Sequence, residues 1–169
     1  MGLFQKLLKK EKQIQPLQQV SDEDIVAMAS GMVVDVTTLP DPLFAESLMG
    51  ETIAFSYTED KITLCAPANG KLSVLFPTGH AFGLVMNNGV ELLVHCGINT
   101  VQENGKGFTI LQKKQGDSVN AGDPIIEVDI KTLSKKYNMS TMLIITNKNN
   151  CDVHFSANGM ISLGDKINI

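Results

Sequence analysis

The chain has no tryptophan, and aromatic residues make up only 5% of its 169 residues. Proteins that bind single-stranded nucleic acid stack bases on aromatic side chains and surround the strand with positive charge. Here the net charge is −4, so the charge also has the wrong sign for a nucleic-acid surface. We therefore expect no nucleic-acid partner.

Long apolar runs and a secretory signal are also missing. A membrane-spanning helix needs about 20 consecutive, mainly apolar residues. The three cysteines, Cys65, Cys96 and Cys151, are odd in number and have neither the spacing of a disulfide framework nor that of a zinc site. Such cysteine usage is typical of a reducing compartment, so we expect a cytoplasmic protein.

The motifs of ATP-dependent phosphoryl transfer are absent as well. The sequence contains no P-loop, no kinase-type glycine-rich loop and no cluster of carboxylates suited to Mg²⁺. ATP is therefore not the expected phosphoryl donor, and we expect no cofactor and no resident metal ion.

Short apolar runs rich in valine and isoleucine, together with 14 glycines, indicate many strands joined by tight turns. Gly-Asp turns recur at Gly116-Asp117, Gly122-Asp123 and Gly164-Asp165. This repetition predicts an all-β fold, an antiparallel sandwich or barrel, with one or two short helices. One helix is expected over residues 129–137, with Asp129 as its N-cap.

The first residues differ from the rest of the chain. Four lysines and one glutamate surround apolar residues at helical spacing, which are Leu3, Phe4, Leu7 and Leu8. Such a segment is either a solvated tail or an amphipathic helix on an anionic membrane surface, with residues 1–15 making the contact. We expect residues 1–20 to be a basic tail and linker, and residues 21–169 to form a single β domain.

Two of the three histidines lie on either side of Asn87-Asn88-Gly89, and Asn-Gly is a strong hairpin signal. A two-residue loop would place His80 and His95 on the same face of the hairpin, directly opposite or diagonal to each other. It would also place Phe82, Leu84 and Leu93 on that face. Only a three-residue loop would separate the two histidines.

Two adjacent imidazoles can hold a phosphoryl group or a metal ion, with one neutral ring attacking and the other donating a hydrogen bond. The nearest carboxylate in sequence, Glu91, is four residues from His95, so the third member of a hydrolytic triad is missing.

These residues carry a resemblance. Residues 89–101 (GVELLVHCGINTV) resemble the phosphoacceptor signature of glucose-type enzyme IIA of the bacterial phosphoenolpyruvate sugar phosphotransferase system, and residues 78–82 resemble the segment with that family's second active-site histidine. Residues 40–46, 66–70 and 105–108 continue the similarity. The resemblance implies a barrel-sandwich hybrid fold with a duplicated motif.

It also implies a phosphoryl carrier. His95 would accept phosphate at Nε2 from the phosphocarrier HPr, His80 would donate a hydrogen bond, and Thr78 would orient His80. The phosphoryl group would pass to a cysteine on the enzyme IIB domain of a membrane sugar permease. Transporters or enzymes that such a protein regulates are further candidate partners.

The resemblance places an exposed apolar docking surface around the histidines, and the alternative for each residue is core packing. Its members would be Phe44, Leu48, Met49, Phe76, Phe82 and Leu93. Asn99 would lie at the rim, where the family usually has aspartate, so a charge that attracts a basic carrier is lost. A second departure, Gly50-Glu51-Thr52 in place of Gly-Asp-Gly, would alter a turn if Thr52 had to take a positive φ.

Two other protein classes are open from the residues. Residues 114–131 resemble a lipoyl- or biotinyl-type carrier, but Ile130 precedes Lys131 and the expected Ala-Met-Lys-Met tip is missing. The Asn-Gly hairpin that ends at His95 resembles a lysostaphin-type zinc peptidase, but Gly97 stands where a second histidine is needed. Two histidines alone would bind zinc only if a partner's carboxylate completed the site.

Overall fold

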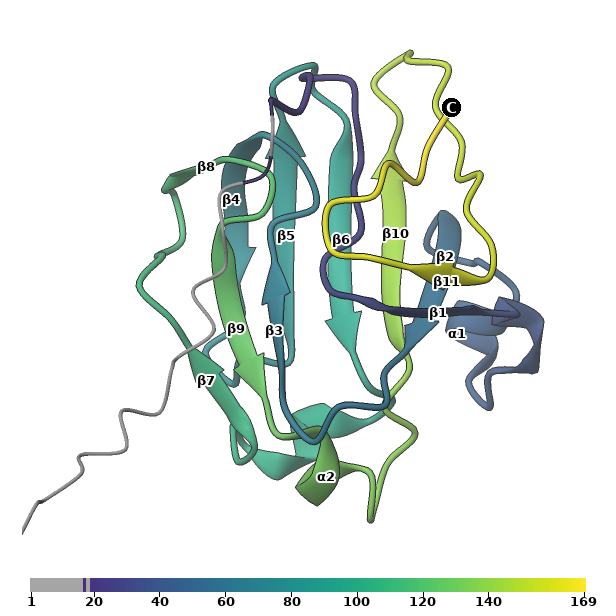
Figure 1. Ribbon diagram of the computed structural model, residues 1–169, viewed down its shortest axis with the longest axis vertical. Helices are drawn as coiled ribbons and strands as arrows, with labels where there is room; N and C mark the ends of the chain where they lie inside the picture. The colour runs from purple at the N-terminus through teal and green to yellow at the C-terminus, as the bar shows by residue number, and fades with distance from the viewer. Residues whose placement is uncertain (1–16, 18) are drawn as a thin grey trace, which may run out of the picture.

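The computed structural model describes residue 17 and residues 19–169 (Figure 1). The expected basic, amphipathic segment with its membrane contact, residues 1–15, therefore lies outside the described residues. Strands dominate the described part, and its α-helices are α1 (Pro42–Ala45) and α2 (Ile130–Leu133), each a single turn. In these residues no helix is both long enough and apolar enough to cross a membrane.

The strands form two antiparallel sheets. The larger sheet has the order β11-β1-β2-β10-β6-β5-β4-β8, and the smaller has the order β3-β9-β7. The bounds are β1 (Gly31–Val34), β2 (Glu51–Ser56), β3 (Ile62–Cys65), β4 (Gly70–Leu75), β5 (Ala81–Met86), β6 (Glu91–Cys96), β7 (Phe108–Ile110), β8 (Ser118–Val119), β9 (Pro124–Val128), β10 (Thr141–Asn147) and β11 (Met160–Ile161). In Figure 1, β1 and β11 cross the direction of β6 and β10. This arrangement confirms the predicted all-β fold.

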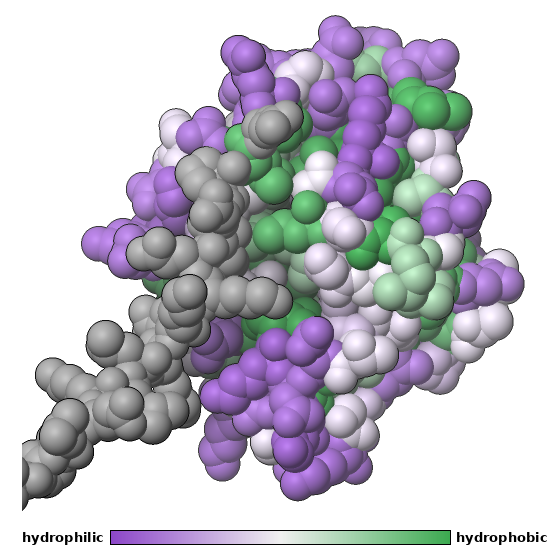
Figure 2. Space-filling model, viewed as in Figure 1, coloured by the Kyte–Doolittle hydropathy of each residue, from purple (hydrophilic) through white to green (hydrophobic). Residues whose placement is uncertain are grey.

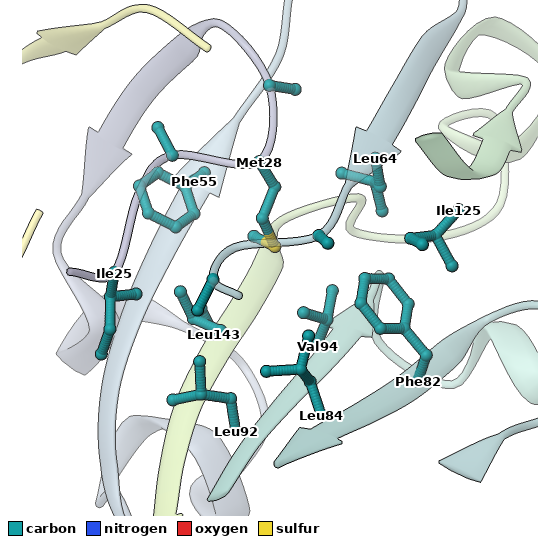
Figure 3. Packing of buried hydrophobic residues seen from close by; sticks show 14 of the residues in the cluster. Ile25, Met28, Phe55, Leu64, Phe82, Leu84, Leu92, Val94, Ile125 and Leu143 are labelled. Carbon is teal, nitrogen blue, oxygen red and sulfur yellow. The ribbon is translucent and has the colours of Figure 1, made fainter. Parts of the chain in front are cut away.

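The main core fills the space between the sheets. Figure 3 shows side chains from both sheets and from the segment before β1 pointing toward one another, and its labelled members are Ile25, Met28, Phe55, Leu64, Phe82, Leu84, Leu92, Val94, Ile125 and Leu143. Burying one such side chain contributes roughly 1.5–3 kcal/mol. On the surface seen in Figure 2, hydrophilic side chains gather at the ends and edges, and hydrophobic ones show in patches between them.

Two of the predicted Gly-Asp turns occupy equivalent places. Ala27 forms two backbone hydrogen bonds with the Gly164-Asp165 turn (2.8 and 3.0 Å), and Ala66 forms the same pair with the Gly122-Asp123 turn (both 2.9 Å). Both turn glycines have φ close to +90°, a conformation that glycine adopts without steric cost. The side chain of Leu17 lies against both glycines. The two turns therefore make matching backbone contacts and share Leu17 as a neighbour.

The hairpin register differs from the predicted one. Ala81 pairs with His95 and Phe82 with Val94, so three residues, Asn87–Gly89, form the loop. The predicted common face is therefore wrong, because Phe82 and Leu84 point into the core while Leu93 and His95 point outward. The reason is burial, because this register puts Phe82 and Leu84 of β5 on the same buried face as Leu92 and Val94 of β6.

Two smaller predictions concern local backbone. Asp129 caps α2 as expected, because its carboxylate accepts a hydrogen bond from the Thr132 backbone N–H (3.0 Å), although the helix ends at Leu133. Glu51 and Thr52 lie in β2, and only Gly50 before them has a positive φ, +138°. The departure from the family pattern at these residues therefore does not strain a turn.

Candidate active site

His80 and His95 lie side by side on the outer face of the larger sheet. Their ring centroids are 5.2 Å apart and the rings are nearly perpendicular, at 80°. His95 is on β6, whereas His80 lies in the bend just before β5, where strand alternation no longer fixes the side-chain direction. The predicted pairing of the two imidazoles is therefore confirmed, but the bend brings them together and the predicted strand register does not.

A backbone carbonyl orients the His95 ring. Nδ1 lies 2.9 Å from the carbonyl oxygen of Gly97, and a carbonyl can only accept a hydrogen bond, so Nδ1 carries the proton. Nε2 is then left with its lone pair. The bond depends on Gly97, whose φ of +73° is in the left-handed region.

The surroundings of His95 favour the neutral imidazole. Burial, with a smaller contribution from neighbouring His80, lowers the pKa of His95 to about 4, while the Gly97 hydrogen bond and the charge of Asp41 oppose the shift. Burial acts in this direction because a charged ring loses solvation. Near neutral pH the ring is therefore uncharged and nucleophilic.

His80 is buried, with 5% of its surface exposed, and burial lowers its pKa as well. The hydroxyl of Thr78 lies 2.6 Å from Nδ1 of His80. When this hydroxyl donates to Nδ1, the imidazole proton is on Nε2, where it can be donated to an oxygen of a bound group. Thr78 thus contacts His80 at the atom needed for the orienting role that the resemblance implies.

Aromatic rings flank both imidazoles. Phe44 of α1 lies with its ring centroid 5.0 Å from that of His95, and Phe76 lies 5.2 Å from His80. Phe44 belongs to a second apolar cluster, which packs α1 and the preceding loop on the outer face of β2, β6 and β10. The site is therefore lined by apolar groups that keep water away from the rings.

The expected apolar docking surface is only partly exposed. Leu48 is 64% exposed, Phe76 is exposed, and Met49 and Leu93 are half-buried. For two of the expected members the prediction of exposure is wrong. Phe82 is fully buried in the main core (Figure 3), because the three-residue loop turns it inward. Phe44 is 3% exposed, because it packs within the second apolar cluster.

Sequence reasoning missed the carbonyl that orients His95, and it did not single out two exposed apolar side chains that are close in sequence to predicted site residues. The Gly97 carbonyl is a backbone group and so leaves no side-chain signal. Leu43 and Val101 are exposed apolar residues on α1 and on the 3-10 helix that follows Asn99. Both lie inside segments that carry the family resemblance, and this was the only sequence feature that could have pointed to them.

Asn99 adopts a left-handed conformation, with φ of 63°, and its side chain is exposed. Asparagine and aspartate are the non-glycine residues that tolerate this region best. The departure from the family pattern here changes the charge and leaves the backbone conformation accessible.

The geometry does not favour the two alternative classes. The described residues hold no group of three or more His, Cys, Asp or Glu side chains placed to bind a metal ion, whereas a catalytic zinc site takes three protein ligands. Lys131 lies in α2 and forms an ion pair with Asp60 (2.9 Å). A carrier lysine would instead stand on the tip of an exposed hairpin.

Comparison with known proteins identifies the family. A family model described as phosphoenolpyruvate-dependent sugar phosphotransferase system, EIIA 1, matches residues 23–151. The glucose-specific EIIA components of Staphylococcus aureus and Staphylococcus epidermidis are each 38% identical over 146 residues, which is 86% of this chain and 83% of theirs.

A solved structure of similar fold carries a related name. Glucose permease IIA from Mycoplasma capricolum superimposes with a TM-score of 0.78 at 31% identity, over 86% of this chain and 93% of the other. The match to the family model covers most of the chain, and the relatives are similar along nearly all of their length. The chain therefore belongs to the EIIA 1 family of the phosphoenolpyruvate-dependent sugar phosphotransferase system.

Proposed function

We propose that the chain is a phosphoryl carrier that accepts phosphate from phospho-HPr on Nε2 of His95 and passes it to the enzyme IIB domain of a sugar permease. The single observation that supports this most strongly is the bond from His95 Nδ1 to the Gly97 carbonyl (2.9 Å). It leaves the lone pair on Nε2 of a neutral ring. Glucose is the proposed sugar, because the names of the relatives describe them as glucose-specific or as parts of a glucose permease.

In the first transfer, the Nε2 lone pair of His95 attacks phosphorus as the P–N bond of the donor histidine breaks. The donor ring leaves with the bonding electron pair, and His95 keeps its proton on Nδ1. His80 donates a hydrogen bond to the phosphoryl oxygens, where charge develops. Positioning two nucleophiles in line replaces the metal and the glycine-rich loop of ATP-dependent enzymes.

In the second transfer, a cysteine thiolate of the IIB domain attacks the same phosphorus from the opposite side. The bond from Nε2 to phosphorus breaks, and its electron pair returns to His95 as the lone pair. The apolar residues around the site exclude water once a partner docks, so the phosphoryl group moves between proteins and is not hydrolysed.

The test is a relay in two stages. The chain is incubated with phosphoenolpyruvate, enzyme I and HPr, and its intact mass is measured. We expect a gain of one phosphoryl group that acid removes and base does not. Addition of the IIB domain of a glucose permease should then remove the label. A chain that gains no phosphoryl group, or keeps it when the IIB domain is present, would contradict the proposal.

A further inference from the structure

We propose that Thr100 is a positioning residue for His95. Its side chain holds the loop after β6 so that the Gly97 carbonyl keeps the His95 imidazole in the tautomer with the proton on Nδ1. This inference rests on the proposed function only for its consequence, the rate of phosphoryl acceptance. The tautomer itself is a property of the unphosphorylated chain.

The Thr100 hydroxyl fixes the peptide unit that precedes the orienting carbonyl. Thr100 is fully buried, and its Oγ1 donates a short hydrogen bond to the carbonyl oxygen of Cys96 (2.6 Å). The N–H of the same peptide unit belongs to Gly97 and donates to the carbonyl of Ser140 (3.0 Å). Because a peptide unit is planar, these two bonds fix its orientation at both edges.

The next peptide unit carries the carbonyl that binds His95. Its oxygen, on Gly97, lies 2.9 Å from His95 Nδ1, and its N–H, on Ile98, donates to the carbonyl of Asn138 (2.9 Å). Three of the four bonds to these two peptide units use backbone groups of the loop and of residues 138–140, or His95 itself. The Thr100 hydroxyl is the one that a substitution can remove without changing His95.

The methyl group of Thr100 supports the same loop by packing. A Cβ atom built on Gly97 would lie 2.5 Å from Cγ2 of Thr100 and 3.0 Å from Sδ of Met139. Thr100 and Met139 therefore contact the Gly97 backbone closely and restrict its movement. The two branches of the Thr100 side chain act on neighbouring peptide units, the hydroxyl by hydrogen bonding and the methyl by contact.

Cys96 links this arrangement to the second imidazole. Its backbone N–H donates to the carbonyl oxygen of His80 (2.8 Å), and its own carbonyl accepts the Thr100 bond. Holding Cys96 thus holds the backbone of both histidines. If the loop relaxes, a neutral imidazole exchanges between its two tautomers, and the form protonated at Nε2 has no lone pair on Nε2 to attack phosphorus.

Two variants separate the branches of the side chain. Thr100→Val keeps the shape and the methyl contact but has no hydroxyl, and Thr100→Ser keeps the hydroxyl. Thr146→Val is the matched control, because it removes a threonine bond to a carbonyl, that of Glu91 (3.2 Å), at the opposite end of β6. The ring ¹⁵N shifts of His95 report the tautomer in the unphosphorylated full chain, and phospho-HPr gives the acceptance rate.

We expect one tautomer, protonated at Nδ1, in the wild type, Thr100→Ser and Thr146→Val. In Thr100→Val we expect a tautomer mixture and a fall of about tenfold in the maximal acceptance rate, with KM for HPr unchanged. If Thr100→Val keeps the single tautomer and the wild-type rate, and only its unfolding temperature falls, Thr100 is merely structural and the inference is wrong. Failure of the proposed function would look different, because wild-type His95 would then accept no phosphate whatever its tautomer.

A second measurement needs no variant. In the wild type, the Thr100 hydroxyl proton should exchange slowly with solvent and show a nuclear Overhauser effect to the Gly97 amide, because it is buried and bonded to Cys96. A rapidly exchanging hydroxyl proton would overturn the inference even if Thr100→Val did not fold.

Discussion

Two histidines of this chain have opposite surroundings. His95 is enclosed by Phe44, His80 and a backbone carbonyl. His154 has 52% of its side chain exposed and lies among charged groups, with Nδ1 2.9 Å from Glu51 and Nε2 3.4 Å from Asp152. Lys148 pairs with the same Glu51 oxygen at 3.0 Å.

The difference bears on the proposal that His95 is the phosphoryl acceptor. The ring of His154 lies against two carboxylates and a lysine. In the other arrangement, a backbone carbonyl orients the imidazole without adding a full negative charge, and burial keeps the ring neutral. The His95 region has the second arrangement, whereas the charged groups around His154 tie the C-terminal segment to β2.

The largest effect is expected when the imidazole of His95 or of His154 is removed in turn. His95→Ala should abolish labelling by phospho-HPr, because no other imidazole in the site has the same orientation. His154→Ala is the matched control and should label like the wild type. Intact mass after incubation with phosphoenolpyruvate, enzyme I and HPr decides between them. Equal labelling of His95→Ala and wild type would mean that the wrong histidine has been identified.

Removing the second imidazole should separate acceptance from onward transfer. His80→Gln keeps a hydrogen-bond donor, which should suffice for taking phosphate from HPr, but it loses the imidazole. We expect onward transfer to be about a hundredfold slower, because the imidazole stabilises the charge that develops in the transition state of that step. Rapid-quench measurement of transfer to the IIB domain checks this. Unchanged onward rates would remove His80 from the mechanism.

The pH dependence sharpens the contrast in a different way. His95 has a folded-state pKa of about 4, against about 6.5 in an unfolded chain. The unfolded chain therefore binds more protons between these values, so the free energy of unfolding should fall as pH drops from about 6.5 to 4, by up to about 3 kcal/mol from this residue. Urea unfolding of wild type and His95→Gln across this range measures it. An equally steep acid dependence in both proteins would contradict the assignment.

Adding a carboxylate to the rim makes the site slightly more like the His154 region. A single exposed charge pair contributes only about 0–1 kcal/mol, so Asn99→Asp should speed phosphorylation by HPr a few-fold at low ionic strength. The gain should fade at about 0.5 M salt, where the screening length is a few ångströms. Stopped-flow rates at two salt concentrations test this. A slower rate, or an equal gain at both salts, would show that Asn99 acts in some other way.

The sequence predicted the fold and the paired histidines, but not how they meet. Asn88-Gly89 indicated a two-residue loop, whereas burial of Phe82 and Leu84 selects a three-residue loop and a shifted register. That choice depends on long-range packing, which local turn preference does not encode. Packing also buries Phe82 in the main core and Phe44 in the second apolar cluster, although the resemblance placed both on the surface.

The site's finer chemistry was hidden for another reason. The carbonyl of Gly97 orients the His95 imidazole, and backbone groups carry no residue-type signal. Thr100 was visible only as part of a motif, and its proposed role depends on the short hydrogen bond from its hydroxyl to Cys96. His80 lies in a bend before β5, and the alternation of side chains between the two faces of a strand does not apply there.

The central claim is that His95 presents Nε2 to the phosphoryl donor because its Nδ1 is bound to Gly97. Nuclear magnetic resonance of the phosphorylated, ¹⁵N-histidine-labelled chain tests this most directly, since phosphorus couples to the nitrogen that carries it. We predict coupling to Nε2 of His95, with Nδ1 still protonated. Phosphate on Nδ1 of His95, or on another histidine, would contradict the account.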